Sequence, residues 1–217
     1  MELRRTANAG FLLTLDGVTI AMDGVCLAVS PYQATPPAEL GRLLAAPPDL
    51  LSYTHDHADH FDPDFARCFQ GAILGTAQIA QALPGKKVIT EPVTIVNVKI
   101  TPVPTRHIGK AGATTCHQSL VVEGSKRVFF MGDATPAQLS QLSRFGKPDA
   151  LIAPFAYAAT ASAVRMVNEA SPQTLILTHL PLRDNDPAML WPAVEAMLPG
   201  FSTPVLIPEM GETVYLH

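Results

Sequence analysis

The ten residues Leu51-Ser-Tyr-Thr-His-Asp-His-Ala-Asp-His60 carry three of the seven histidines of this 217-residue chain, together with two aspartates. They overlap the end of the apolar run 49–53, which we expect to form a buried strand. A solvated loop or a helix face would scatter such titratable groups, whereas a metal site gathers them. The pattern H-x-H-x-D-H over 55–60 therefore predicts a metal site at the end of this strand.

The spacing within this pattern offers two groups of candidate ligands. His55 and His57 are two residues apart at a strand end, where alternate side chains share a face, so both imidazoles can reach one cation. Asp59 and His60 follow as the chain turns into the next helix, and they can converge on a second position nearby. Asp56 then points away from the first cation and acts as a spacer. These candidates are too few to enclose two cations, so the hypothesis requires further ligands from distant strand ends.

Three more candidate ligands stand where apolar, strand-like runs stop. A sheet of such strands gathers its strand ends on one rim, which would bring these side chains to the H-x-H-x-D-H pattern. Imidazole and carboxylate ligands without a thiolate suit zinc, manganese or iron. A structural role stays open for each of them: His107 as a loop histidine, Asp133 as a helix-capping aspartate and His179 as a core histidine. The three residues are, in chain order, His107, Asp133 and His179.

The composition predicts one domain over residues 1–217 with a sizeable core. Hydrophobic residues make up 47% of the chain, and the formal net charge is −4. This balance gives no electrostatic surface for nucleic acid or for an anionic membrane, so we expect a small-molecule substrate and neither of those partners. No apolar run approaches the roughly 18 residues that a membrane span needs.

The cysteines and the first apolar run bear on the compartment. Asp16-Gly17 interrupts that run, so we do not expect a signal peptide. The cysteines are far apart, odd in number and without a C-x-x-C pair, which favours a reducing, cytoplasmic compartment. They are Cys26, Cys68 and Cys116.

Turn and cap signals predict a layered α/β protein. Asp16-Gly17 between two β-rich runs predicts a hairpin over 10–28, and Asp62-Pro63 predicts the start of a helix that runs through 65–69. Hairpins early and helix–strand alternation late fit a layered α/β fold. The other expected helices are 38–44, one between 75 and 87, 136–144, 160–169 and 186–198. The other expected strands are 72–75, 87–90, a single strand over 92–103, 117–122, 127–131, 149–154, 173–178 and 203–208.

In this order along the chain, H-x-H-x-D-H, the lone His107, Gly132-Asp133 after a strand-like run and His179 within "LILTHL" resemble the metallo-β-lactamase superfamily. The resemblance runs through the full chain, from "NAGFLLTLDGVTIAMDG" onward. It implies an αββα four-layer sandwich with a dinuclear metal centre at one edge. Carried over by position, it implies one metal held by His55, His57 and His107. It implies a second metal held by Asp59, His60 and His179, with Asp133 bridging the two.

Within the superfamily, "THDHADH" and the short chain resemble the lactonase-like, metal-dependent hydrolases. The common antibiotic-hydrolysing zinc lactamases place a cysteine ligand where this chain has Asp133. No insertion matches the tRNA-binding arm of the RNase Z branch, and the chain is too short for the flavin domain of flavodiiron proteins. The resemblance implies zinc first among the metals, with manganese or iron as alternatives.

The activity that the resemblance implies is hydrolysis by a hydroxide shared between two metals. Such a hydroxide attacks a carbonyl carbon or a phosphorus while one metal polarises the substrate oxygen. The substrate is then an ester, a lactone, a thioester or a phosphodiester, and Asp133 and Asp59 are the carboxylates expected to take part in catalysis. Two alternatives use the same fold: an iron-dependent oxidoreductase similar to a sulfur dioxygenase, and a non-catalytic metal-binding protein.

Substrate contacts are expected around the same rim. Lys110 and Arg183 flank it and could hold an anionic group, although solvation of either cation is the open alternative. His117 begins a strand that heads for the rim, where it could touch the substrate or brace a ligand from behind. Asp23 is expected to hydrogen-bond the loop that carries the candidate ligands.

Overall fold

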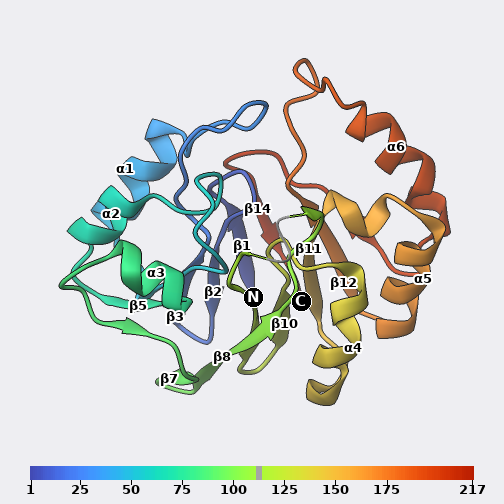
Figure 1. The fold of residues 1–217 in the computed structure, drawn as a ribbon. Coiled ribbons are helices and arrows are strands. Elements are labelled where there is room, and N and C mark those ends of the chain that lie inside the picture. Colours follow the sequence, from blue (N-terminus) through green and yellow to red (C-terminus); the bar gives the residue numbers. More distant parts are fainter. Residues whose placement is uncertain (111–113) are drawn as a thin grey trace.

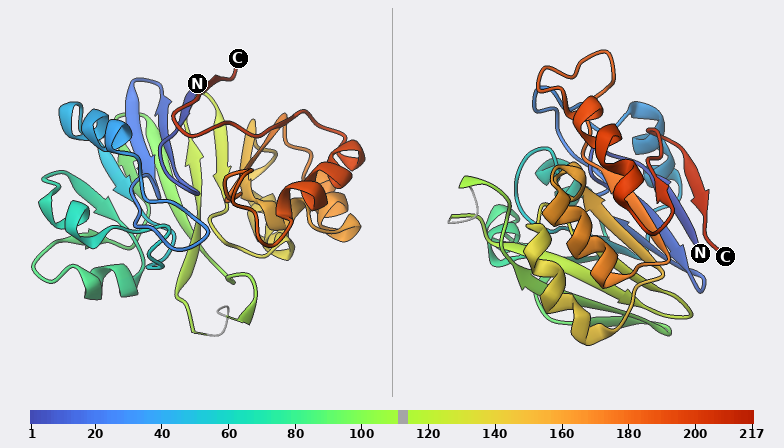
Figure 2. Two further views of the ribbon diagram at one scale, coloured as in Figure 1. Left: turned by 90° about the horizontal axis from the view of Figure 1, so that it is seen from above. Right: turned by 90° about the vertical axis from the view of Figure 1, so that its right-hand side faces the viewer.

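The computed structural model describes residues 1–110 and 114–217, and in it two β-sheets pack face to face between two layers of helices (Figure 1). Within the described residues each sheet has seven strands. The view from above in Figure 2 separates the two halves, with the helices of the N-terminal half on one side and the orange and red helices on the other. This is the αββα sandwich that the resemblance implied, and it agrees with the layered α/β fold predicted from the turn and cap signals.

The first sheet has the strand order β14-β1-β2-β3-β4-β5-β6. Strands β3 to β6 run parallel, while the remaining pairs are antiparallel. The predicted hairpin turn at Asp16-Gly17 joins β2 to β3, and both turn residues have positive φ, at 51° and 81°. The strands are β1 Glu2–Arg5, β2 Phe11–Leu15, β3 Val18–Met22, β4 Leu50–Ser52, β5 Ala72–Leu74, β6 Val88–Ile89 and β14 Thr213–Tyr215.

The second sheet has the order β13-β12-β11-β10-β9-β8-β7. Its strands β10 to β13 are parallel, and β7 to β10 form antiparallel hairpins. The strands are β7 Val93–Ile95, β8 Val98–Thr105, β9 His117–Glu123, β10 Arg127–Phe130, β11 Ala150–Pro154, β12 Thr174–Thr178 and β13 Val205–Leu206.

Helices cover the outer face of each sheet. The predicted start of α2 is confirmed, because the Asp62 carboxylate accepts hydrogen bonds from the N–H groups of Asp64 and Phe65. The helices over the first sheet are α1 Pro37–Ala45, α2 Pro63–Cys68 and α3 Ala77–Ala82. Those over the second are η2 Pro136–Gln138, α4 Leu139–Leu142, η3 Ser143–Phe145, η4 Phe155–Ala158, α5 Ala161–Ala170, α6 Leu190–Met197 and η5 Leu198–Gly200. In the described part of the chain, no helix has both the length and the apolar character of a membrane span.

Two expectations about elements were wrong, and one pair of strands was missed. The single strand expected over 92–103 is a hairpin of β7 and β8, whose turn includes Val96 at φ 54°. The last helix begins at Leu190 rather than at 186, because the Asp186 carboxylate accepts from the N–H groups of Leu190 and Trp191. Strands β1 and β14, which pair with each other at one edge of the first sheet, were not expected.

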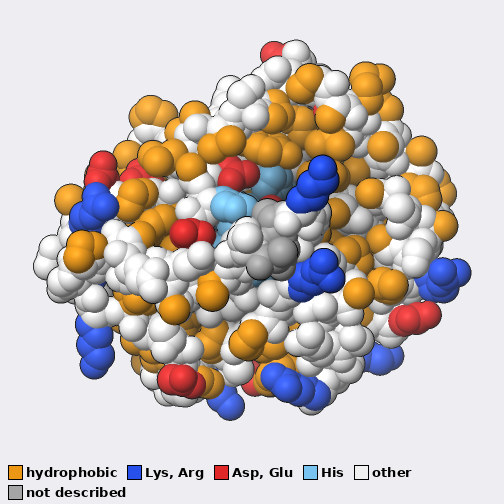
Figure 3. Space-filling view, in the orientation of Figure 1, with side chains coloured by type: hydrophobic (Ala, Val, Ile, Leu, Met, Phe, Trp, Pro, Cys, Tyr) orange, Lys and Arg blue, Asp and Glu red, His pale blue; other side chains and the backbone are white. Residues whose placement is uncertain are grey.

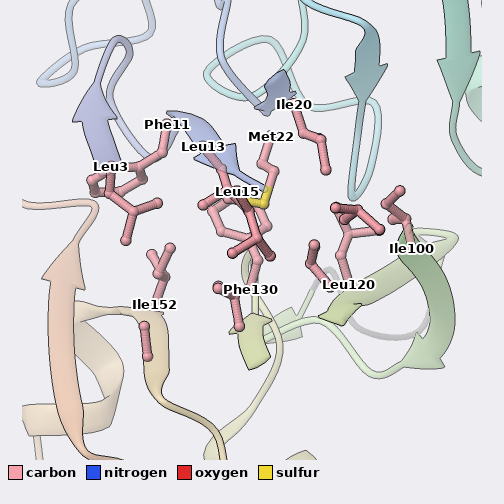
Figure 4. Close-up of a cluster of buried hydrophobic side chains, with 14 of the residues drawn as sticks. Leu3, Phe11, Leu13, Leu15, Ile20, Met22, Ile100, Leu120, Phe130 and Ile152 are labelled. Atoms are coloured by element: carbon pink, nitrogen blue, oxygen red, sulfur yellow. The ribbon is translucent and has the colours of Figure 1, made fainter. Parts of the chain in front are cut away.

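The main core lies between the two sheets. Figure 4 shows side chains of the first sheet, such as Leu13 and Met22, facing side chains of the second, such as Leu120 and Phe130. All four are at most 1% exposed, and each contributes about 1.5–3 kcal/mol of hydrophobic stabilisation by its burial. Two further cores lie between each sheet and its helices. Strands β4, β10 and β12, whose ends reach the edge where the histidines lie, are buried on both faces over most of their length.

Candidate metal centre

Four strand ends deliver the seven predicted ligand residues to one edge of the sandwich. Loop 53–62 follows β4, and the remaining residues follow β8, β10 and β12. Figure 3 shows the pale-blue histidine side chains in a hollow of this face, with red carboxylates beside them. We call this set the histidine–aspartate cluster; its members are His55, His57, Asp59, His60, His107, Asp133 and His179.

The cluster contains two groups of three residues whose ligand atoms lie within 4.8 Å of one another. These groups are His55, His57 and His107, and Asp59, His60 and His179. Both match the division that the resemblance implied. Each group could therefore hold one metal ion.

Asp133 lies between the two groups. Its Oδ2 atom is 3.5 Å from Nε2 of His107, which belongs to the first group. The same Oδ2 atom is 3.5 Å from Nε2 of His179, and Oδ1 is 3.5 Å from Nε2 of His60. A carboxylate in this position could contact an ion in either group.

Several buried polar atoms of the cluster point to cations as the missing partners. Nε2 of His60, Nε2 of His107 and Oδ1 of Asp133 have no hydrogen-bond partner among residues 1–110 and 114–217. A buried polar atom without a partner costs about 1–3 kcal/mol. Divalent ions coordinated by these imidazoles and this carboxylate would remove that cost, so the residues fit a metal centre.

Residues behind the cluster fix the orientation of its imidazoles. Asp23 is fully buried and accepts hydrogen bonds from the backbone N–H of Thr54 at 2.7 Å and from its hydroxyl at 2.6 Å. The same carboxylate lies 2.8 Å from Nδ1 of His60, which leaves Nε2 of His60 facing the cluster. The expected bond from Asp23 to the ligand loop is thus confirmed, and such supporting carboxylates orient ligands in metal sites.

Two further imidazoles are oriented in the same way. The Thr54 hydroxyl donates to Asp23, so it accepts from Nδ1–H of His55 at 2.9 Å and leaves Nε2 of His55 unprotonated. His107 donates Nδ1–H to the Ile108 carbonyl at 2.7 Å, which leaves its Nε2 atom unprotonated. Both nitrogens are therefore available as metal ligands.

The cluster is electrostatically coupled. Burial alone would raise the pKa of Asp133, but the neighbouring His179, His60 and His55 hold it well below its usual value. Burial alone would lower the pKa of His60, but Asp133 and Asp23 raise it well above its usual value. The Asp133 carboxylate therefore stays ionised, and a divalent cation would take the place of the His60 proton.

Two strand ends at this site have a left-handed backbone conformation. Gly132 has φ 52°, and a Cβ atom there would lie 2.6 Å from the Thr54 hydroxyl oxygen. Only glycine allows Asp133 to leave β10 at this angle while Thr54 keeps its contact with Asp23. His179 also adopts a left-handed conformation, with φ 61°, directly after β12. Strained residues of this kind collect at functional sites.

His117 lies behind the cluster, with both of its ring nitrogens occupied by hydrogen bonds. Its Nε2 atom accepts from the backbone N–H of Asp133 at 3.0 Å, so its Nδ1–H donates to the Thr105 hydroxyl at 2.8 Å. Burial lowers the pKa of His117 to about 3, which keeps the imidazole neutral. This geometry favours the bracing role over the substrate contact that was also predicted.

The two predicted substrate cations are exposed. Arg183 forms an ion pair with Glu195 at 2.7 Å, and its guanidinium carbon lies 3.8 Å from the centre of the Trp191 ring. Lys110 is exposed as well, next to the undescribed residues 111–113. In the described part of the chain, neither forms an ion pair with a member of the cluster.

Tyr32 contacts the cluster but was not predicted from the sequence. Its ring packs edge-on against the His179 ring, with centroids 4.4 Å apart. Burial and the nearby Asp133 and Asp59 raise the pKa of its hydroxyl. Tyr32 lies in a Pro- and Ala-rich loop without a recognisable motif, so no local signal marked it.

Comparisons with known proteins agree with this geometry. The model of the β-lactamase superfamily domain matches residues 18–180. No curated protein matches the sequence significantly. Among solved structures, a possible metal-dependent hydrolase from Veillonella parvula has a TM-score of 0.76 at 16% identity, over 99% of this chain and 98% of that chain. The isothiocyanate hydrolase from Delia radicum gut bacteria has a TM-score of 0.73 at 18% identity, over 99% of both chains.

A third similar structure is that of a hydroxylase. CmlA, a diiron β-hydroxylase from Streptomyces venezuelae, has a TM-score of 0.69 at 16% identity, over 99% of this chain and 54% of that chain. At these identities the likenesses show a common fold. The family model covers most of the chain, including the H-x-H-x-D-H pattern and His179. The chain therefore belongs to the metallo-β-lactamase superfamily.

Proposed function

We propose that the chain is a metal-dependent hydrolase that uses two divalent metal ions to cleave an ester, lactone, thioester or phosphodiester bond. The observation that carries this proposal is the meeting of two three-residue ligand groups, with the Asp133 carboxylate 3.5 Å from imidazole nitrogens of both. Imidazole and carboxylate ligands suit zinc first, with manganese or iron as alternatives. The hydrolase names of two similar structures support the reaction class.

The residues of the cluster have distinct roles in this proposal. His55, His57 and His107 would hold one ion and Asp59, His60 and His179 the other, and Asp133 lies close enough to both groups to contact either ion. Bound ions would supply an activated water as nucleophile and a Lewis acid for the substrate oxygen.

The two carboxylates of the cluster differ in burial. Asp133 is buried, and its backbone is held by hydrogen bonds to His117 and Ile108, so its carboxylate is fixed in place. The side chain of Asp59 is 14% exposed, and its Oδ2 atom lies 3.2 Å from Nε2 of His179. Asp59 is therefore the carboxylate that can orient a nucleophile and accept its proton from the open side of the site.

A small-molecule substrate in the cytoplasm fits the remaining features. The three free cysteines agree with a reducing compartment. Lys110 and Arg183 are both exposed near loops that border the site, where either could meet an anionic group of the substrate.

The test is a panel of lactone, thioester, ester and phosphodiester substrates presented to the metal-loaded protein. We expect turnover of at least one class, and an Asp133→Asn variant should lose at least about 100-fold in rate, since even residues that only support metal ligands cost about 10- to 100-fold. Asp64→Asn is the matched control, because the Asp64 side chain is 87% exposed on α2. A metal-loaded protein that turns over no substrate in the panel, or an Asp133→Asn variant as active as the control, would contradict the proposal.

An iron-dependent oxygenase is the second candidate. The observation that favours it is the shared fold with the diiron hydroxylase CmlA. Three results together would favour this candidate over the hydrolase: iron as the native metal, oxygen uptake in the presence of a glutathione persulfide, and no hydrolysis of any substrate in the panel.

A further inference from the structure

A cavity of about 510 Å³ opens beside the histidine–aspartate cluster. Tyr32 lines this cavity, and the same ring packs against His179 of the cluster. Leu180, which directly follows His179, lines it as well. Tyr32 and Leu180 therefore separate the cavity from the candidate metal centre by about one side chain, since none of the described residues that line the cavity belongs to the cluster. The other walls come from Arg5 and Asn8, from residues 31, 33 and 181–184, from Trp191 and from residues 207–210.

The cavity contains a buried cation without an anionic partner. Arg5 lines it and is only 6% exposed. Its guanidinium donates to the backbone carbonyls of Ala7, Asn8 and Pro208, which uses three of its five N–H groups. Arg5 has no ion pair with any carboxylate of residues 1–110 and 114–217. Burial lowers its pKa to about 10, and a buried charge without a partner is strongly unfavourable.

A second unpaired donor lies beside this cation. Asn8 is 3% exposed and lines the same cavity. Its Nδ2 atom has no hydrogen-bond partner in the described part of the chain. Its backbone carbonyl is fixed by Arg5 and by the Thr178 hydroxyl, one residue before His179. The amide donor is therefore buried and unsatisfied, and the backbone that carries it is held at the end of β12.

We propose that this cavity binds a carboxylate group of the substrate through the Arg5 guanidinium and the Asn8 side-chain amide. The inference rests on the proposed hydrolysis at the neighbouring cluster, and it narrows the substrate to one with a carboxylate at a short distance from the bond that is cleaved. Guanidinium and carboxylate match in planar geometry, and their charge-assisted hydrogen bonds are the strongest that side chains form.

The charges around the opening favour a monoanion over a dianion. Asp184 and Glu209 line the opening and are exposed, so they repel a second negative charge, while the cationic Arg183 beside them is already paired with Glu195. Trp191 and Leu182 add apolar surface to the wall, which suits a carboxylate carried on an aromatic or aliphatic group. The cavity thus fits an organic acid better than a phosphate.

Trp191 allows a direct binding test, because it is the sole tryptophan of the chain and lies in the cavity wall. The purified, metal-loaded protein is titrated with phenylacetate and with the uncharged phenylacetamide while the Trp191 fluorescence is recorded. We expect saturable binding of phenylacetate, with phenylacetamide at least about tenfold weaker because it offers the guanidinium no charge. Inorganic phosphate should bind more weakly than phenylacetate.

Asn8→Asp is the decisive variant. It keeps the shape of the side chain, removes the free N–H donor and gives Arg5 a carboxylate neighbour, so we expect an unchanged or higher melting temperature. Phenylacetate affinity should fall at least about tenfold. The matched control is Asp64→Asn, the reverse exchange at an exposed position of α2 that does not line the cavity, for which a change of less than about twofold is expected.

Equal affinity for the acid and the amide, no saturable Trp191 response, or unchanged phenylacetate affinity in Asn8→Asp would overturn the inference. Tighter binding of phosphate than of phenylacetate would overturn the choice of carboxylate. The titration needs no turnover, so its result does not depend on whether the proposed hydrolysis is correct. A protein that binds phenylacetate in this way but hydrolyses nothing would contradict only the reaction.

Discussion

At the residue scale, the cluster depends on side chains outside the set of candidate ligands. Asp23 and Thr54 tie the first sheet to the candidate ligands, and His117 braces the backbone of Asp133. These contacts orient the imidazoles before any metal binds. A metal site with such support keeps its affinity high because its ligands need little rearrangement.

The first prediction concerns Asp23→Asn. The substitution keeps the size of the side chain but removes the charge that holds Nδ1–H of His60 at 2.8 Å. We expect metal affinity to fall by about 10- to 100-fold, as measured by competition with a chromophoric chelator. Asp56→Asn, in the same loop, is the control and should stay near wild type. Equal affinities for both variants would show that Asp23 does not orient a ligand.

The second prediction concerns Gly132→Ala. The new Cβ atom would lie 2.6 Å from the Thr54 hydroxyl oxygen at a φ of 52°, so we expect a loss of about 2 kcal/mol or more in the free energy of unfolding. Gly17→Ala separates the effect of a positive φ from the effect of a steric clash. Gly17 has φ 81°, but a Cβ atom there would have no neighbouring atom within 4 Å. Its loss should be about 1 kcal/mol in the same chemical denaturation experiment. Similar losses for both variants would mean that the contact with Thr54 adds nothing.

At the element scale, strands and helices with strong local signals were predictable from the sequence. Asp16-Gly17 marked the β2–β3 hairpin, and Asp62-Pro63 marked the start of α2. The elements that were missed depend on distant partners instead. Strands β1 and β14 pair across nearly the whole length of the chain, and no local pattern encodes such a pairing.

The hairpin of β7 and β8 was missed for a different reason. Its turn contains Val96, a β-branched residue with φ 54° and an exposed fraction of 85%. Valine is disfavoured in this conformation, so the sequence reads as an uninterrupted strand. The antiparallel pairing of the two strands overrides this local preference.

A third prediction follows from that strain. Val96→Asn should raise the free energy of unfolding by about 0.5–1 kcal/mol, because asparagine tolerates positive φ and no buried surface is lost. Chemical denaturation of the metal-free protein measures it. A destabilised variant would mean that the valine side chain contributes to packing that outweighs its backbone strain.

The candidate site was predictable to the extent that its residues stand at strand ends. The seven members of the histidine–aspartate cluster follow apolar runs, and parallel strands bring such ends to one edge. Tyr32, Arg5 and Asn8 have no such marker, because their place beside the cluster is set by loop packing. Their proximity to His179 becomes visible only in three dimensions.

At the scale of the whole molecule, two sheets packed face to face carry one reactive edge. The first sheet provides the loop after β4, and the second provides the ends of β8, β10 and β12. Each ligand group draws on both sheets, so metal binding ties the two halves together. A ligand that binds only the folded state stabilises it, and we expect metal loading to raise the melting temperature.

Metal content per chain, measured by elemental analysis of the purified protein, tests the central claim most directly. We predict about two divalent ions per chain, falling to about one in a His107→Ala variant and in a His179→Ala variant, because each histidine belongs to a different ligand group. A wild-type protein that binds no divalent ion, or variants that retain the full wild-type content, would contradict the account.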